Sequence, residues 1–167
     1  MDKLGRVLVY TGEGKGKSSQ ALGVAVRMAG MGKKVAIVYF DQGFRHDRER
    51  YFLDLYQGYV EYFLTGLDKR DSDTGEFCLE VLPEEIVKAS KGLRKAREYA
   101  QSGNYDVLIL EEINVLAAMG IVSCKEILDM IVNKPAYLNM ILTGRNCPDC
   151  IMEKADFVTE IREIHRY

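Results

Sequence analysis

A run of glycine, lysine and serine near the amino terminus carries the residue types that bind phosphate. Residues 10–20 read YTGEGKGKSSQ, directly after the apolar run 7–10 and directly before a stretch of small residues. Glycines let successive backbone N–H groups converge on one anion, and a following helix aims its unpaired N–H groups and its dipole at the same point. Lys17 would place a positive charge against the outer phosphates, and the Ser18 hydroxyl could ligate a phosphate-bound magnesium ion. The segment therefore predicts a site for a nucleoside triphosphate.

The spacing departs by one residue from the common form of this loop. The pattern G-x-x-x-x-G-K-[ST] places its first glycine at position 11, which is Thr11 here, and the glycine comes at Gly12. An ordinary glycine-rich turn between a strand and a helix is the alternative, but such a turn does not require a lysine followed by a serine. The residues expected to bind the phosphates are Gly12, Glu13, Gly14, Lys15, Gly16, Lys17, Ser18 and Ser19.

Two adjacent carboxylates provide a second half for such a site. Glu111 and Glu112 follow the apolar run 107–110, and ligands of open α/β sheets gather at the carboxyl ends of the strands. Either carboxylate could ligate magnesium together with Ser18, and Glu112 could instead act as a base. Because neighbouring side chains on a strand point to opposite faces, only one of them faces the loop unless the strand has already ended. A solvent-exposed turn is the alternative for both.

A third candidate segment follows another apolar strand. Thr143, Gly144 and Arg145 come directly after the apolar residues 140–142, so they should lie at the same edge of the sheet as the glutamates. Arg145 is a candidate contact to phosphate or substrate, because a guanidinium binds such groups with two parallel hydrogen bonds. A surface arginine is the alternative.

Apolar runs alternate with helical patterns along the whole chain. Continuous apolar runs at 35–40 and 107–110 predict strands that are buried on both faces, as in a parallel sheet. Further strands are expected at 7–10, 60–64, 137–143 and 157–164, and helices after the loop, after Pro83 and after the capping box of Ser123 and Glu126. The helical positions expected to face the sheet are Ala21, Leu22, Ala25, Met28, Ala29, Ile86, Ala89, Leu93, Ala96, Ala100, Ile127, Leu128, Ile131 and Val132.

This alternation predicts an α/β fold with a mostly parallel sheet flanked by helices. Residues 41–50 are expected to form a polar loop that leads into a short helix near 48–56, and residues 65–80 a mobile loop. At 167 residues the chain is expected to form a single nucleotide-binding domain, residues 1–167.

Composition limits the classes of function. The 25 acidic and 23 basic residues give a net charge of −2, so the sequence has no basic surplus of the kind that binds nucleic acid in general. Arg94, Lys95 and Arg97 are better explained as the solvent-exposed face of a helix. No apolar run suits export or a membrane span, and we expect a cytoplasmic protein without a membrane partner.

The chain has four cysteines, Cys78, Cys124, Cys147 and Cys150. In the cytoplasm they are expected to be thiols. Cys147 and Cys150 have the spacing of a redox pair or of half a zinc site, but Cys78 and Cys124 stand alone in the sequence and supply no second pair. We favour instead a helix that begins here, with Pro148 in its first turn.

These motifs together resemble one family. The segments TGEGKGKSS at 11–19, LEE at 110–112, ILTGR at 141–145 and ADFVTE at 155–160 are similar to those of the P-loop ATP:corrinoid adenosyltransferases, and the resemblance runs from about Gly5 to Arg162. It implies a RecA-like P-loop NTPase architecture. The glycine that comes one position late is a feature of that family.

The resemblance implies a transfer of the 5′-deoxyadenosyl group of ATP to the cobalt(I) of a corrinoid, with release of triphosphate. Lys15, Lys17, the loop amides and Mg²⁺ would then neutralise the leaving triphosphate, and no side chain need act as the nucleophile. It also implies a homodimer and a flavoprotein reductase as a partner.

The chain differs from the family pattern at several positions. The family usually has asparagine at the position of Glu13. The Glu13 carboxylate should weaken triphosphate binding unless it points outward or pairs with Lys15. The aromatic pair that follows the turn near Gly66 in the family is absent here. Two other functions therefore stay open, a P-loop ATPase or kinase with a different acceptor and a nucleotide-gated binding protein.

Overall fold

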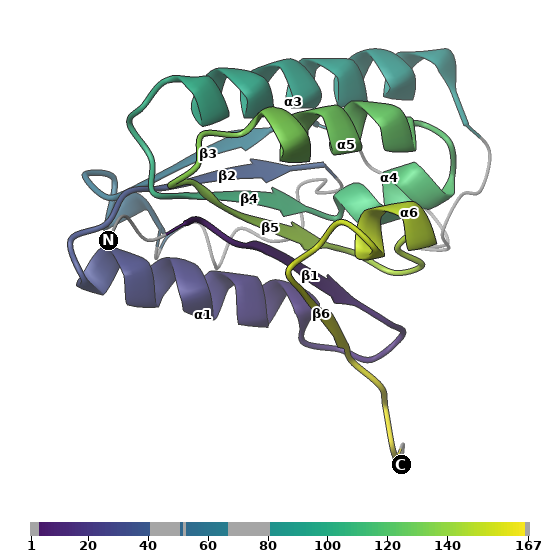
Figure 1. Ribbon diagram of the computed structural model, residues 1–167, viewed down its shortest axis with the longest axis horizontal. Helices are drawn as coiled ribbons and strands as arrows, with labels where there is room; N and C mark the ends of the chain where they lie inside the picture. The colour runs from purple at the N-terminus through teal and green to yellow at the C-terminus, as the bar shows by residue number, and fades with distance from the viewer. Residues whose placement is uncertain (1–3, 41–50, 52, 67–80, 166–167) are drawn as a thin grey trace.

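The strands of the molecule form one six-stranded sheet in which every neighbouring pair is parallel (Figure 1). The computed structural model describes residues 4–40, 51, 53–66 and 81–165. The strand order across the sheet is β3-β2-β4-β5-β1-β6. The strands are β1 (Val7–Thr11), β2 (Val35–Tyr39), β3 (Val60–Leu64), β4 (Val107–Glu111), β5 (Asn139–Thr143) and β6 (Phe157–Glu160). The predicted α/β fold with a parallel sheet is confirmed.

Helices cover both faces of this sheet. Figure 1 shows α1 below the sheet, with α3, α4, α5 and α6 on the opposite side. Each face has its own core cluster, one of which packs the strands against α1 and the other against the remaining helices. The helices are α1 (Lys17–Gly30), α3 (Pro83–Gln101), α4 (Ile113–Ala118), α5 (Cys124–Asn133) and α6 (Asp149–Met152).

The burial of α1 follows from small residues spaced four apart. Ala21, Ala25 and Ala29 are buried on one side of this helix, and their size lets the helix lie close to the sheet. Because β1 feeds directly into the loop and α1, the glycine-rich segment lies at the carboxyl edge of the sheet. The ends of β4 and β5 lie at the same edge, so this edge is the natural place for a ligand.

Two of the helical faces differ in detail from the sequence prediction. On α3 the predicted Ala89, Leu93, Ala96 and Ala100 are buried, but Ile86 is 46% exposed and the prediction for it is wrong. Its neighbour Glu85 takes the inward position, because its carboxylate accepts a hydrogen bond from the Leu82 N–H at 3.0 Å. Glu85 therefore caps the start of the helix while its side chain is buried.

On α5 the capping box of Ser123 and Glu126 is confirmed. Ile127, Met130 and Ile131 are buried, whereas Val132 is 71% exposed, contrary to the prediction. One residue step turns a helix by about 100°, which carries Val132 away from the sheet.

Some predicted segments are shorter in the structure or lie outside the described residues. The fifth strand begins at Asn139 rather than residue 137, and the last one ends at Glu160 rather than residue 164. The loop at 41–50, the segment 67–80 and Cys78 lie outside the described residues. Of the helix expected near 48–56, residues 51, 53 and 54 are helical and residues 55–56 form a turn, while residues 48–50 and 52 are not described. Within the described ranges, no helix is both long and apolar enough to span a bilayer.

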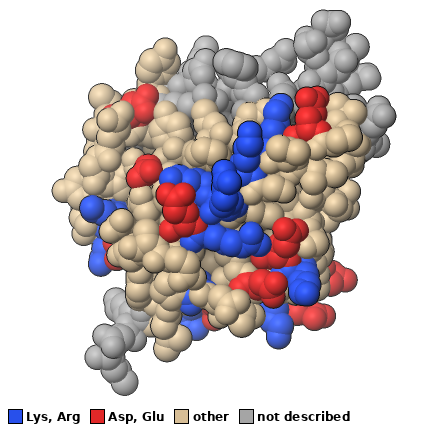
Figure 2. Space-filling model, turned by 90° about the horizontal axis from the view of Figure 1, so that it is seen from above, with Lys and Arg blue, Asp and Glu red and all other residues tan. Residues whose placement is uncertain are grey.

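Figure 2 looks onto the face that α3 and α5 cover. Basic side chains gather near the middle of this face, with acidic side chains beside them. On α3, Lys95 pairs with Glu98 at 2.8 Å and lies over the ring of Tyr99, 4.6 Å from its centre. Arg94 and Arg97 are exposed, as expected for the solvent-facing side of this helix.

Candidate functional site

The glycine-rich segment forms a tight loop between β1 and α1. Gly12 and Gly16 have backbone φ angles of +96° and +113°, values that residues with a side chain rarely adopt. Gly16 directly precedes α1, whose first residue is Lys17. The first N–H groups of a 14-residue helix are thereby placed beside the loop, which is the arrangement that binds phosphate in related loops.

Lys17 is the central cation of the loop. Its side chain is buried, with 6% exposure, and Nζ donates hydrogen bonds of 2.7 Å each to the carbonyl oxygens of Gly12 and Gly14. Burial lowers the pKa of Lys17 from its usual 10.5, and the charge of Glu112 opposes this most strongly. The ammonium group is thus held inside the loop by groups that a polyanion can replace.

The other predicted loop residues differ in exposure. Ser18 is half-buried, whereas Glu13, Lys15 and Ser19 are exposed. Glu13 does face outward, but the ion pair that it makes is with Arg145, at 3.2 Å, rather than with Lys15. This ion pair brings Arg145 next to the loop, as predicted from the position of both segments at one edge of the sheet.

The segment after β6 packs directly on the loop. Gly14 N–H donates to the carbonyl oxygen of Ile161 at 2.8 Å, and Ile161 N–H donates to the carbonyl oxygen of Thr11 at 2.8 Å. A Cβ atom on Gly12 or Gly14 would lie only 2.5 or 2.8 Å from that Ile161 oxygen. Glycine is therefore required here for a protein contact as well as for a ligand. Sequence reasoning missed this contact, because 147 positions separate the two segments.

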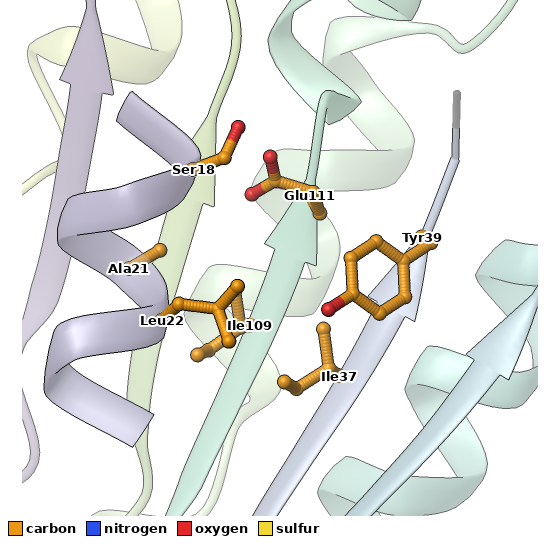
Figure 3. Close-up of a pocket in the computed structure, with 7 residues that line it drawn as sticks. All are labelled: Ser18, Ala21, Leu22, Ile37, Tyr39, Ile109 and Glu111. Carbon is orange, nitrogen blue, oxygen red and sulfur yellow. The ribbon is translucent and has the colours of Figure 1, made fainter. Parts of the chain in front are cut away.

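Glu111 lies across a small pocket from α1. Figure 3 shows its carboxylate pointing toward Ser18, with Ala21 and Leu22 below and Tyr39 on the β2 side. Glu111 is buried, with 2% exposure. The carboxylate and the Ser18 hydroxyl, which belong to segments 93 positions apart, line the same pocket.

The chain turns sharply immediately after Glu111. Glu112 has a φ of +62°, a left-handed conformation that is rare for a residue with a side chain. The strand has therefore ended at Glu111, so the alternation of side chains does not send Glu112 to the far face. Its charge and that of Glu111 both act on Lys17 and raise the pKa of this lysine. Both carboxylates thus contribute negative charge near the loop.

The segment that carries Arg145 is held in place from two sides. Gly144 has a φ of +128°, and a Cβ atom there would lie 3.0 Å from the Val115 nitrogen. The buried Asn114 side chain donates to the Gly144 carbonyl oxygen at 3.4 Å, and Cys147 N–H donates to Thr11 Oγ1 at 3.2 Å. These contacts join the segment to α4 on one side and to the end of β1 on the other.

A hydroxyl that the sequence analysis did not single out connects the two glutamates. Thr143 Oγ1 donates to Glu111 Oε2 at 2.6 Å and accepts a hydrogen bond from Glu112 N–H at 2.9 Å. The only signal in the sequence was the place of Thr143 at the end of the strand before Arg145. Nothing in the sequence indicates that β5 lies beside β4.

The oxygen donors of this pocket suit magnesium. Mg²⁺ prefers hard oxygen ligands and usually takes only one or two carboxylates, while phosphates and water complete its shell. Ser18 and Glu111 offer a hydroxyl and a buried carboxylate in one pocket. Within the part of the chain that the structure describes, no group of three or more His, Cys, Asp or Glu side chains could hold a metal ion. The hydroxyl and the carboxylate would leave the other positions around such an ion to phosphates and water.

The three cysteines that the structure describes are not among the residues that line this pocket. A helix, α6, begins just after Cys147, as predicted. Pro148, however, occupies the N-cap position before the helix rather than its first turn. Burial chiefly raises the pKa of the Cys147 thiol to about 12. Cys124 is not alone in space, as the sequence had suggested, because its thiol interacts with that of Cys150, which raises its pKa. All three cysteines within the described ranges are free thiols.

Solved structures share this fold. The chain superposes on a KaiC-like protein of Pyrococcus horikoshii OT3 with a TM-score of 0.59 and 15% identity, over 97% of this chain and 75% of the other. It superposes on the flagellar accessory protein FlaH of Methanocaldococcus jannaschii with a TM-score of 0.60 and 16% identity, over 94% of this chain and 71% of that one. At such low identity the likeness concerns the fold alone.

Proteins similar in sequence are more informative about the family than these structures. The chain is 31% identical over 167 residues to the corrinoid adenosyltransferase of Escherichia coli (strain K12), covering 98% of this chain and 79% of that protein. It is 28% identical to the corrinoid adenosyltransferase CobA of Salmonella typhimurium, with the same coverage. It is 31% identical to the corrinoid adenosyltransferase of Pseudomonas aeruginosa, covering 96% of this chain and 76% of that protein.

A family model covers almost the whole sequence. The model described as ATP:corrinoid adenosyltransferase BtuR/CobO/CobP matches residues 3–167. This match spans the glycine-rich loop, the glutamate pair and the Arg145 segment, which the structure brings to one edge of the sheet. The chain therefore belongs to the ATP:corrinoid adenosyltransferase family.

Proposed function

We propose that this protein transfers the 5′-deoxyadenosyl group of ATP to the cobalt(I) of a corrinoid and releases triphosphate. The observation that supports the assignment most is the loop around Lys17, whose ammonium group lies among carbonyl oxygens at the start of a helix. In a member of this family, such a loop is the place for the triphosphate.

The proposed reaction makes a specific demand on the protein. Cobalt(I) donates an electron pair to the 5′ carbon, a cobalt–carbon bond forms, and the carbon–oxygen bond to the triphosphate breaks with its electrons remaining on oxygen. Negative charge therefore develops on the leaving triphosphate. Lys17, Lys15 and the N–H groups of the loop would stabilise that charge, which is the contribution that a preorganised site makes to catalysis. No side chain needs to act as the nucleophile.

Magnesium would assist the same step. Ser18 and Glu111 are the residues that would hold it, with Glu112 beside them, and the ion would supply further positive charge to the phosphates. The Arg145 guanidinium would leave Glu13 and contact the triphosphate. A guanidinium binds a phosphate group at least as well as it binds a carboxylate. Catalytic roles are assigned to Lys17 and Glu112, and metal-binding roles to Ser18, Glu111 and Glu112.

The proposal extends to the wider setting of the protein. It takes the chain as a single nucleotide-binding domain that acts in the cytoplasm, and the family resemblance suggests a homodimer that receives its cobalt(I) corrinoid from a flavoprotein reductase. These features belong to the proposal, and size measurements in solution would test the dimer directly.

Product analysis tests the proposed reaction. The protein is incubated with ATP and Mg²⁺, with and without chemically reduced cobalamin, and the products are separated by chromatography. We expect triphosphate and an adenosylated corrinoid in equal amounts, and only when the reduced corrinoid is present. Lys17→Ala should abolish both products, whereas Lys125→Ala, which removes an exposed lysine on α5, should not.

Two results would contradict the assignment. Release of ADP and phosphate without corrinoid would indicate an ATPase or kinase that uses Glu112 as its base. Binding of ATP without any product under either condition would indicate a nucleotide-gated binding protein.

A further inference from the structure

Thr143 lies at the centre of the acidic side of the site. It is the last residue of β5, its exposure is 0%, and it sits beside the end of β4. Its hydroxyl contacts both glutamates, the Glu111 carboxylate at 2.6 Å and the Glu112 backbone N–H at 2.9 Å. Neither the glycine-rich loop motif nor the glutamate pair in the sequence predicts a role for the Thr143 side chain.

The direction of these two hydrogen bonds is fixed by chemistry. A backbone N–H can only donate, so the Glu112 N–H uses a lone pair of the Thr143 oxygen. The single hydroxyl proton is then free to point at Glu111 Oε2, which must accept it. A hydroxyl that donates to a carboxylate at 2.6 Å makes a short, charge-assisted hydrogen bond. This bond holds the Glu111 carboxylate in one orientation.

The chain takes a left-handed turn at Glu112, with a φ of +62°. At this point the strand ends, and the Glu112 N–H donates to Thr143 Oγ1 on β5. Such conformations cost free energy and persist where the surroundings hold them. Here the Thr143 hydroxyl is one of the groups that hold it, so the turn and the carboxylate orientation are coupled through a single side chain.

We propose that Thr143 is a positioning residue that orients the Glu111 carboxylate toward Ser18 for the magnesium ion of Mg-ATP. The inference rests on the proposed function, because the ion would enter with the nucleotide. One carboxylate oxygen, Oε2, is engaged by Thr143, and the carboxylate as a whole points into the pocket that Ser18 lines (Figure 3). Groups that orient a metal ligand typically change metal affinity 10- to 100-fold when they are removed.

Thr143→Val separates this role from packing, because valine has nearly the same shape and lacks the hydroxyl. The backbone ladder between β4 and β5 does not use the side chain. Calorimetry would measure ATP affinity with saturating Mg²⁺ and again with EDTA. We expect Thr143→Val to weaken the binding of Mg-ATP about 10-fold or more while metal-free ATP affinity stays within about twofold. Thr143→Ser keeps the hydroxyl and should restore most of the Mg²⁺ effect.

Controls keep the test decisive. Thr159→Val makes the same change on the exposed strand β6 and should leave both affinities unchanged. If Thr143→Val does not fold, the comparison of Thr143→Ser with Thr143→Ala isolates the hydroxyl in a smaller side chain. Equal loss of affinity with and without Mg²⁺, no loss at all, or a Thr143→Ser protein as weak as Thr143→Val would overturn the proposal.

The same measurements distinguish this inference from the proposed function. If the wild-type protein fails to bind Mg-ATP, the proposed function itself is wrong. If the wild-type protein binds Mg-ATP and transfers the adenosyl group, but Thr143→Val keeps its full Mg²⁺ dependence, only the role of Thr143 is refuted.

Discussion

Among single residues, Lys17 combines burial, positive charge and hydrogen bonds to the loop that surrounds it. Burying an ammonium group costs free energy unless the group is hydrogen-bonded. The buried position of Lys17 therefore depends on the two carbonyl oxygens that accept hydrogen bonds from Nζ. These bonds are local and weaker than bonds to phosphate. The same group can therefore stabilise the loop before the nucleotide binds and the triphosphate afterwards.

This position leads to opposite effects of pH on stability and on binding. Burial lowers the pKa of Lys17 below 10.5, so in alkaline solution the folded protein loses this proton before the unfolded chain does. Across that interval, Lys17 should make the free energy of unfolding rise with pH, while ATP affinity falls as the charge is lost. The measurement compares wild type with Lys17→Met by urea denaturation and by ATP titration between pH 7 and pH 10. Identical pH profiles for the two proteins would contradict this account.

Glu13 should reduce nucleotide affinity at neutral pH. Its carboxylate holds Arg145 at 3.2 Å and would repel the phosphates. Both side chains are more than half exposed, so the effect is modest and sensitive to salt. We expect Glu13→Gln to tighten ATP binding about two- to fivefold at low salt, and the gain should shrink when Arg145→Gln is also present. Asp129→Asn removes an equal charge from the exposed side of α5 and serves as the control.

At the scale of elements, the nucleotide loop depends on the segment that follows β6. The backbone of Ile161 is hydrogen-bonded to both Thr11 and Gly14, so the loop is held in place by the segment after β6. This contact explains why position 14 is a glycine. Gly14 does not have a positive φ angle, but it lies too close to Ile161 for a side chain to fit.

Gly14→Ala should therefore destabilise the protein even without nucleotide. The new Cβ atom would lie 2.8 Å from a backbone oxygen, which cannot rotate away as a side chain would. We expect a loss of about 1–3 kcal/mol in the free energy of unfolding, together with weaker ATP binding. Gly23→Ala is the matched control, because its Cβ atom meets open space in the middle of α1 and should be neutral or stabilising. Equal stability of the two variants would show that the Ile161 contact is unimportant.

The elements themselves could be read from the sequence, because each has a clear local period. The apolar runs at 35–40 and 107–110, the capping box at Ser123 and the glycine-rich loop all lie where they were predicted. The errors at Ile86 and Val132 concern apolar side chains at the border of the buried stripe, a distinction that apolarity alone does not make.

The contacts between distant segments could not be predicted in the same way. Ile161 on the loop, Thr143 beside Glu111 and Cys124 beside Cys150 all depend on the order of strands and helices in space. The sequence placed Glu111, Glu112 and Arg145 at one edge because a parallel sheet aligns the ends of its strands. It did not show which strands are neighbours, so it missed the residue that joins them.

For the molecule as a whole, stability in acid should depend on the carboxylate that joins β1 to the start of β6. Asp156 accepts hydrogen bonds from Val7 N–H at 2.8 Å and from Arg6 Nη1 at 3.0 Å. The bond from Val7 is the main cause that lowers the pKa of Asp156 from 3.8. A lowered pKa contributes stability that is complete above the unfolded value and is lost as the pH falls through the folded value.

Asp156→Asn tests this contribution. The amide would place a second donor against either Arg6 or Val7, so we expect a loss of up to about 1 kcal/mol at pH 7. The difference from wild type should shrink as the pH falls below about 4, because the Asp156 carboxyl becomes protonated first in the unfolded chain and then, at its lowered pKa, in the folded protein. Urea denaturation of both proteins at pH 7, 5 and 3 measures the difference in their free energies of unfolding. A difference that stays constant over this range would point to packing rather than to charge.

The position of β1 in the sheet also has a consequence for biosynthesis. Among the strands of this sheet, β1 is synthesised before the others, and it lies between β5 and β6, which are synthesised last. The loop after β1 is covered by Ile161. A nascent chain therefore holds an incomplete sheet, in which the apolar strand β1 lacks its neighbours, until β5 and β6 have been synthesised. Contacts of such long sequence separation form slowly. Nucleotide-binding competence should accordingly arise late, after translation of the final strand rather than of the loop.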